Sequence, residues 1–230
     1  MNIGGLQKTS LLDYPGCISM IIWTNGCNLK CPFCYNKNLA LGVEKTYPEE
    51  DVFSFLSKRK GMIDGVVITG GEPLIQKDIV SFAEKVKKQG YLLKIDTNGT
   101  LPEKIRELLD GKLVDYIAMD IKAPKSKYDQ LSGIKVDASK IDESIDLIKN
   151  KAPDYEFRTT MVPGMLTKED VLEIAEWIKG AKRYYLQQFR VNPPLISSKL
   201  EKIQPYAPSY LYEIADMVKP LVEKCTVRGV

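Results

Sequence analysis

"CISMIIWTNGCNLKCPFCYN", residues 17–36, joins a short apolar run to a polar loop that carries three cysteines. Residues 17–23 combine isoleucines with an aromatic residue, which is typical of a buried β-strand. Cys27, Cys31 and Cys34 follow at once, with the spacing C-x3-C-x2-C. In parallel α/β folds, loops at the C-terminal ends of strands build the active site. This stretch therefore predicts an α/β fold whose chemistry begins where its first strand ends.

Five further β-rich runs follow, with helical patterns between them: residues 65–69, 91–96, 114–120, 155–162 and 183–190. This alternation is typical of parallel β/α units. The segments "TGGEP" (69–73), "DTNG" (96–99) and "DIK" (120–122) each stand at the end of one of these runs. We therefore expect a partial (β/α)6 TIM-like barrel with parallel strands, in which these strand ends share one site.

Several helices are marked by capping residues or by helical spacing. Thr46 with Glu49, and Thr167 with Asp170, have the spacing of capping boxes and predict two helix starts. Apolar residues at helical spacing predict a helix over residues 75–86. The remaining helices are expected at residues 102–109, 139–148 and 209–218. No repeat, low-complexity tract or long linker interrupts these elements, so we expect residues 1–230 to form a single domain.

Composition excludes several classes of partner and of chemistry. The 230 residues carry a net charge of +3 without a polybasic run, so neither nucleic acid nor a membrane surface is expected as the partner. No apolar run approaches the ~20 residues that span a bilayer, and five cysteines without a disulfide pattern favour a reducing cytoplasm. Histidine is absent, so catalysis must depend on cysteine, carboxylate, lysine or a cofactor.

The cysteine loop leaves three kinds of site to compare. Structural zinc usually takes paired C-x2-C units or histidines, and the chain has neither a second pair nor a histidine. Packing in the core is disfavoured because the three cysteines lie in a polar loop. An iron–sulfur cube normally takes four thiolates, so three leave one iron open to an external ligand. The spacing therefore favours a cluster with an open iron.

The C-x3-C-x2-C loop resembles the signature of radical S-adenosylmethionine (radical SAM) enzymes. The resemblance implies that Cys27, Cys31 and Cys34 hold a [4Fe–4S] cluster and act in catalysis through it. It implies also that S-adenosylmethionine chelates the open iron and that an electron from the cluster cleaves its sulfonium to a 5′-deoxyadenosyl radical. The whole chain would then be one radical SAM core domain.

The segment "GGEP" resembles the glycine-rich strand end of the same superfamily. Glycines allow close backbone approach, and a glutamate can accept a charge-assisted hydrogen bond from an ammonium group. Without the cysteine motif, "GGEP" would more often be an ordinary turn before a helix. The resemblance implies that Gly70, Gly71 and Glu72 meet the methionine amino group of S-adenosylmethionine.

The strand-end aspartates are open to several interpretations. Asp96, Thr97 and Asp120 could do acid–base work, hold a cation or cap the next helix. "DTNG" and "DIK" resemble segments of glycyl-radical-enzyme activases that bind a monovalent cation and the carboxylate of S-adenosylmethionine. The resemblance implies that Asp96, Thr97 and Asp120 are cation ligands and that Lys122 contacts that carboxylate.

Other residues are weaker candidates. Phe33 and Tyr35 could pack against the cluster or adenine, or fill the loop. Arg158 is a charge within an apolar strand, where charges are usually paired or functional. Gln188 or its neighbour Gln187 could contact ribose or substrate, while whichever points outward would be a solvent-facing polar residue. Packing is expected for the two remaining cysteines, Cys17 and Cys225.

Over its whole length the chain resembles the activating proteins of anaerobic ribonucleoside-triphosphate reductase. The resemblance rests on "GGLQKTSLLDYPGCIS" (4–19), "DTNG", "DIKAP", "YYLQQF" and the final "CTVRG". It implies that the chain removes a hydrogen atom from a glycine of that glycyl radical enzyme and receives electrons from a low-potential donor such as flavodoxin or ferredoxin. Tyr35 follows the third cysteine, at a position where related activases often have a histidine.

Two alternatives stay open at this point. One is a radical SAM enzyme that acts on a small molecule and resembles 7-carboxy-7-deazaguanine synthase, which predicts a closed, ligand-sized pocket. The other is an electron-transfer or metal-binding module without enzymatic activity, for which four protein ligands at the cluster would be expected.

Overall fold

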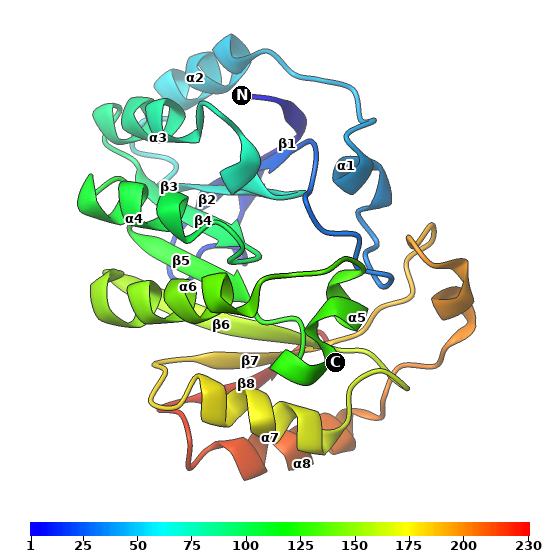
Figure 1. The fold of residues 1–230 in the computed structure, drawn as a ribbon. Helices are drawn as coiled ribbons and strands as arrows, with labels where there is room; N and C mark the ends of the chain where they lie inside the picture. The colour runs from blue at the N-terminus through cyan, green and yellow to red at the C-terminus, as the bar shows by residue number, and fades with distance from the viewer.

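The computed structural model describes residues 1–230, and one eight-stranded sheet runs through it in the order β1 to β8 (Figure 1). The strands are β1 (Ile3–Ser10), β2 (Ser19–Thr24), β3 (Gly65–Gly70), β4 (Leu92–Thr97), β5 (Tyr116–Asp120), β6 (Asp154–Met161), β7 (Tyr184–Gln188) and β8 (Cys225–Arg228). Strands β2 to β7 are the six predicted strands, and each pairs in parallel with the next. The predicted parallel α/β core is confirmed.

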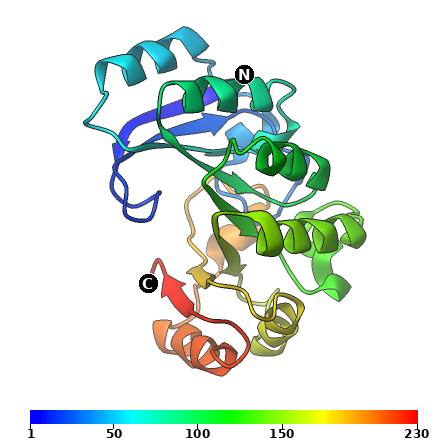
Figure 2. The same cartoon turned by 90° about the vertical axis from the view of Figure 1, so that its left-hand side faces the viewer.

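Two strands at the edges of the sheet were not predicted. β1 pairs antiparallel with β2, and β8 pairs in parallel with β7. β1 holds two adjacent glycines and alternates weakly, while β8 has only four residues, so neither carries a clear strand pattern. β1 and β8 do not pair with each other, and Figure 2 shows these blue and red strands at opposite edges of a curved sheet. The barrel is therefore open on one side.

Helices occupy the connections between the parallel strands. The α-helices are α1 (Lys37–Leu41), α2 (Glu49–Lys58), α3 (Ile79–Lys88), α4 (Pro102–Asp110), α5 (Tyr128–Ser132), α6 (Ala138–Lys151), α7 (Lys168–Trp177) and α8 (Pro208–Val218). Three 3₁₀ turns are η1 (Pro73–Ile75), η2 (Lys125–Lys127) and η3 (Ser198–Lys202). None of the helices combines the length and the apolar character that crossing a bilayer would require.

Of three helix starts predicted from the sequence, one is confirmed and two are wrong. Thr167 and Asp170 form the expected capping box at α7, with both reciprocal hydrogen bonds present. The box predicted at Thr46 is wrong, because α2 starts at Glu49 and its N-cap is Pro48, which has no side-chain donor or acceptor. The helix predicted from residue 75 starts only at Ile79, since Ile75 belongs to η1 and the next residue is extended.

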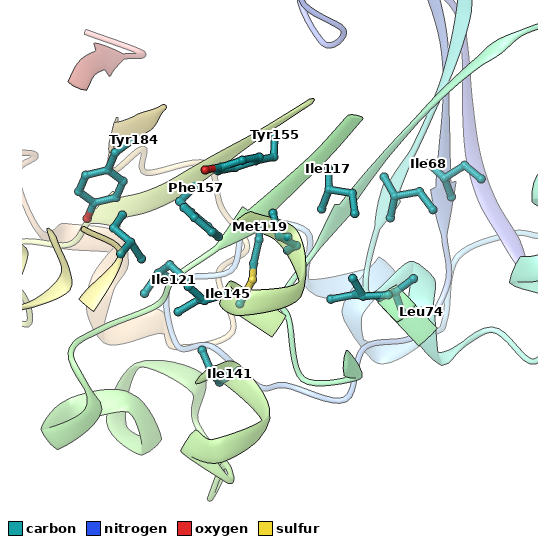
Figure 3. Packing of buried hydrophobic residues seen from close by; sticks show 14 of the residues in the cluster. Ile68, Leu74, Ile117, Met119, Ile121, Ile141, Ile145, Tyr155, Phe157 and Tyr184 are labelled. Carbon is teal, nitrogen blue, oxygen red and sulfur yellow. The ribbon is translucent and has the colours of Figure 1, made fainter. Parts of the chain in front are cut away.

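The main core lies between the outer face of the sheet and the helices. Figure 3 shows Ile68 from β3, Ile117 and Met119 from β5 and Phe157 from β6 within this core, and all four are at most 2% exposed. Residues one position along point to the inner face, where Tyr14, Ile21, Val67, Tyr116 and Ala118 form a separate apolar cluster. Toward the strand ends the inner face becomes polar, and the functional site lies there.

Candidate active site

A cavity of about 640 Å³ lies at the C-terminal ends of the parallel strands. Its volume falls in the range of small-molecule pockets. Its lining includes all of the predicted site residues: Cys27, Cys31, Phe33, Cys34, Gly70, Gly71, Glu72, Asp96, Thr97, Asp120, Lys122, Arg158 and Gln188. The structure therefore brings together residues that lie up to 161 positions apart (188 − 27). Their individual roles toward cofactors stay predictions.

Backbone hydrogen bonds hold the cysteine loop against two short helices. The amides of Gly26 and Cys27 donate to carbonyls of Leu39 and Ala40 in α1, at 2.7 and 3.0 Å. The amide of Lys30 donates to the carbonyl of Ser132 at the end of α5, at 2.9 Å. Figure 1 shows the loop beside α5. These hydrogen bonds hold the cysteine loop against α1 and α5.

Burial disfavours the thiolate form of all three cysteines. Burial raises the pKa of all three, and burial together with the charge of Glu72 raises the pKa of Cys27 to about 12. No three Cys, Asp or Glu side chains lie close enough to bind one metal ion. In a cluster each iron takes its own thiolate, so the thiolates need not converge in that way.

The "GGEP" segment lies directly against the cysteine loop. A Cβ added at Gly71 would lie 1.9 Å from the carbonyl oxygen of Gly26, so no other residue fits there without a backbone shift. Gly70 has a φ of +118°, which favours glycine, and the amide of Glu72 donates to the Gly26 carbonyl at 2.8 Å. These contacts join the end of β3 to the loop of β2.

Glu72 is 2% exposed, and its carboxylate is held by three donors. Oε1 accepts from the Leu74 amide at 3.1 Å and the Thr97 hydroxyl at 2.8 Å, and Oε2 accepts from the Asn98 amide at 2.7 Å. Burial raises the pKa of Glu72 to about 7, although these hydrogen bonds oppose the shift. A buried carboxylate poised near neutrality is suited to receive an ammonium group.

Asp96 and Asp120 face each other across one guanidinium group. Arg158 donates from Nη1 to Asp96 Oδ2 at 3.2 Å and from Nε to Asp120 Oδ1 at 2.8 Å. Lys94 bonds Asp96 Oδ1 at 2.7 Å, and Lys122 bonds Asp120 Oδ2 at 3.1 Å. Burial alone would raise the pKa of both aspartates, but Arg158 and the lysines outweigh it and hold both values low.

These contacts leave little room for a monovalent cation. All four oxygens of Asp96 and Asp120 are already engaged by side-chain cations. The hydroxyl of Thr97, the third predicted ligand, donates to Glu72. As arranged, these residues do not fit a monovalent cation, which would have to displace Arg158 or a lysine. Cation binding stays a prediction from the resemblance.

The remaining candidates also border the cavity. Phe33 is buried and packs into the main core, while Tyr35 is half exposed at the rim. Gln188 donates to the carbonyl of Tyr206 at 2.7 Å, and its buried Oε1 has no partner. Gln187 lines the cavity as well, so neither glutamine is a plain solvent-facing residue.

The two remaining cysteines lie outside the site. Cys225 is buried in the main core, and Cys17 packs against the inner apolar cluster. The expectation that both serve packing agrees with these positions.

Sequence reasoning missed a polar network beside the cysteines. Asn98 donates to Asn28 Oδ1 at 2.9 Å, and Asn28 donates to the Thr100 hydroxyl at 2.7 Å. Asn98 also lines the cavity. The signal was present, since these residues stand in or beside "DTNG" and the cysteine loop, but asparagine and threonine are common turn residues. Other lining residues were missed as well: Trp23, Thr160, Arg190 and Arg228.

Comparison with known proteins identifies the family. The profile of the radical SAM superfamily matches residues 21–178, more than half of the chain. The chain belongs to the radical SAM superfamily. The matched region contains the cysteine loop, "GGEP" and both strand-end aspartates.

Relatives within the radical SAM superfamily differ in their named activities. A Methanocaldococcus jannaschii protein, provisionally named a glycyl-radical enzyme activating enzyme, is 34% identical over 99% of this chain and 96% of its own length. The pyruvate formate-lyase-activating enzyme of Listeria monocytogenes is 29% identical over 77% of this chain and 75% of its own. The 7-carboxy-7-deazaguanine synthase of Thermoplasma acidophilum is 34% identical, but over only 50% of this chain and 52% of its own.

Solved structures agree with the radical SAM fold. The crystal structure of Streptococcus suis SuiB bound to S-adenosylmethionine superimposes with a TM-score of 0.65 and 20% identity, over 89% of this chain and 48% of SuiB. Membership of the radical SAM superfamily, rather than this fold similarity, gives the chain a [4Fe–4S] cluster and S-adenosylmethionine as cofactors. The observed site fits them, because three cysteines and one buried carboxylate line the same cavity.

Proposed function

We propose that this radical SAM enzyme activates a glycyl radical enzyme, an anaerobic ribonucleotide reductase, by removing a hydrogen atom from one of its glycines. The proposal rests chiefly on the match to the Methanocaldococcus jannaschii relative, because it extends over 99% of this chain. The target reductase is chosen from the resemblance of "GGLQKTSLLDYPGCIS", "DIKAP" and "YYLQQF" to reductase activators.

The open side of the sheet supports a protein substrate. Asp13 and Trp23 border the cavity from the N-terminal edge, and Arg228 and Gly229 border it from the C-terminal edge. Because β1 and β8 do not pair, an extended peptide segment could reach the cavity between these edges. A small-molecule enzyme would instead be expected to enclose its ligand.

The residues of the chain have distinct roles in this proposal. When bound, the cluster and S-adenosylmethionine supply a 5′-deoxyadenosyl radical through reductive cleavage of the sulfonium. Cys27, Cys31 and Cys34 hold the cluster, and Glu72 accepts hydrogen bonds from the methionine amino group. Lys122 contacts the methionine carboxylate. The buried inner face below the site keeps water from the reacting atoms.

Anaerobic incubation with a partner reductase tests the proposal. The loaded chain, purified reductase, S-adenosylmethionine and a reductant are mixed, and electron paramagnetic resonance (EPR) spectra are recorded. A glycyl radical on the reductase is expected, absent with Cys31→Ala or with the reductase glycine replaced by alanine. Formation of 5′-deoxyadenosine with no protein radical on any glycyl radical enzyme tried would reject the activase proposal. Using flavodoxin or ferredoxin as the reductant tests the proposed cytoplasmic electron donor.

One observation favours a second candidate. The Thermoplasma acidophilum 7-carboxy-7-deazaguanine synthase matches this chain at 34% identity, although over half of each chain. That candidate predicts a deazaguanine product formed in step with 5′-deoxyadenosine. The activase is preferred because its relative matches nearly the full length of both chains.

A further inference from the structure

Asn98 contacts both Glu72 and Cys27 in the active site. Its side chain is buried, and the residue is 5% exposed. The backbone amide donates to Glu72 Oε2 at 2.7 Å, and the side-chain Nδ2 donates to Cys27 Sγ at 3.9 Å. One residue thus joins the carboxylate that meets S-adenosylmethionine to a ligand of the cluster.

The orientation of the Asn98 amide group is settled by its neighbours. Its Oδ1 accepts from the Thr100 amide at 3.0 Å and from the Thr100 hydroxyl at 2.7 Å. A backbone amide can only donate, so the atom facing it must be the oxygen. The NH₂ group therefore points to Cys27 and to Asn28 Oδ1, which it meets at 2.9 Å.

The position of this donor has an electrostatic consequence. The Cys27 sulfur already accepts a hydrogen bond from the Leu29 amide at 3.4 Å, and Asn98 adds a side-chain donor. Reduction adds negative charge to an iron–sulfur cluster, and hydrogen bonds to its sulfurs stabilise that charge. A donor at Cys27 therefore raises the reduction potential of the cluster.

We propose that Asn98 is a positioning residue that sets the reduction potential of the cluster through its N–H···S hydrogen bond to Cys27. This role goes beyond the proposed function, because it concerns electron transfer into the cluster and holds whatever substrate follows. Thr100 belongs to the same hydrogen-bond network, but its hydrogen bonds go to Asn28 and Asn98 and not to a sulfur. The proposed role therefore belongs to Asn98 and not to Thr100.

Redox titration followed by EPR tests the role. Asn98→Ala removes the donor and is expected to shift the midpoint potential of the reconstituted cluster to a more negative value. Thr100→Val is the matched control, since it disturbs the same loop and leaves the Asn98 donor in place. Its midpoint is expected to stay at the wild-type value.

Two results would overturn the proposal. One is an Asn98→Ala midpoint equal to wild type, and the other is an equal shift in Thr100→Val, which would assign the effect to loop geometry. If Asn98→Ala does not fold, Asn98→Leu decides the question, because leucine has a similar size, has no hydrogen to donate to the sulfur and adds no charge beside it. An unshifted potential in Asn98→Leu would reject the role. These readouts need no substrate protein, so failure of the proposed function leaves the test intact.

Discussion

The carboxylate of Glu156, in β6, accepts hydrogen bonds from both terminal nitrogens of Arg228, in β8. Nη1 donates to Oε1 at 2.6 Å and Nη2 to Oε2 at 2.9 Å, a bidentate pair. Glu156 is fully buried and also accepts from the Tyr116 hydroxyl at 2.8 Å. The pair ties the short edge strand β8 to the strand beyond its neighbour, and it lies beside the open edge of the barrel.

Arg228→Ala should destabilise the protein markedly. The change leaves the buried Glu156 carboxylate with only the more distant Arg158 guanidinium, at 3.9 Å, so the cost should approach about 3–5 kcal/mol of unfolding free energy, which is typical of a broken buried ion pair. Denaturant unfolding of the free protein measures it. Lys219→Ala is the control, because Lys219 pairs with Asp216 at 2.6 Å on the solvent-exposed surface and the loss of such a pair should change stability little.

A double variant distinguishes the electrostatic contribution of the Glu156–Arg228 pair to stability from the packing contribution of the Arg228 side chain. Adding Glu156→Gln to Arg228→Ala should recover part of the lost stability, since no buried charge is then left unpaired. If the double variant is less stable than either single variant, the pair owes its effect to packing of Arg228 against the Tyr185 ring.

Gly71→Ala should prevent cluster assembly while leaving the sheet folded. The new Cβ would lie 1.9 Å from the Gly26 carbonyl oxygen, so the cysteine loop must move away from β3. Such overpacking costs about 1–3 kcal/mol. We expect low iron content per chain after reconstitution, together with a wild-type circular dichroism spectrum.

Gly61→Ala provides a control for adding a methyl group to a glycine. Gly61 has a φ of +79° and no atom within 4 Å of an added Cβ. Its replacement should cost about 1 kcal/mol of stability and leave iron content unchanged. Full iron content in Gly71→Ala would show that the close approach is not needed for the cluster.

Binding of S-adenosylmethionine should weaken as the pH falls below about 7, because the raised pKa of Glu72 leaves its carboxylate protonated there. Equilibrium dialysis of the loaded enzyme between pH 6 and 8 measures this. Glu72→Gln should bind weakly with little pH dependence. A wild-type affinity that is constant over this range would contradict the role of Glu72.

The raised pKa of Glu72 also predicts that the unfolding free energy of the free protein depends on pH. The pKa of Glu72 is raised in the folded state from 4.5 to about 7, so its contribution to stability is fully present below pH 4.5 and lost as the pH rises through 7. The loss is on the order of 3 kcal/mol. Between these limits, wild-type unfolding free energy should fall relative to that of Glu72→Gln.

The strand-end motifs were predictable from sequence because each lies directly after an apolar run, and parallel strands place such ends together. The Glu156–Arg228 pair was not, since 72 residues separate its members and Glu156 stands in no motif. Asn98 does stand in "DTNG", but its contact with Cys27 spans 71 residues, and no local pattern predicts that contact. Local patterns locate the site, whereas the side-chain cations that occupy it depend on the register between distant strands.

Arg158→Gln tests whether the strand-end aspartates bind a monovalent cation. In the wild type Arg158 engages one oxygen of Asp96 and one of Asp120, so stability should be the same in sodium, potassium and choline chloride at equal ionic strength. Without the guanidinium group these two oxygens lose their partner while Lys94 and Lys122 stay in place, so the loss of stability should be smaller than the about 3–5 kcal/mol of a fully unpaired buried charge. A small cation could then take its place, so sodium or potassium should recover part of that loss and choline should not. A wild type that itself requires sodium or potassium would instead mean that the cation binds by displacing Arg158, as the resemblance to activases implies.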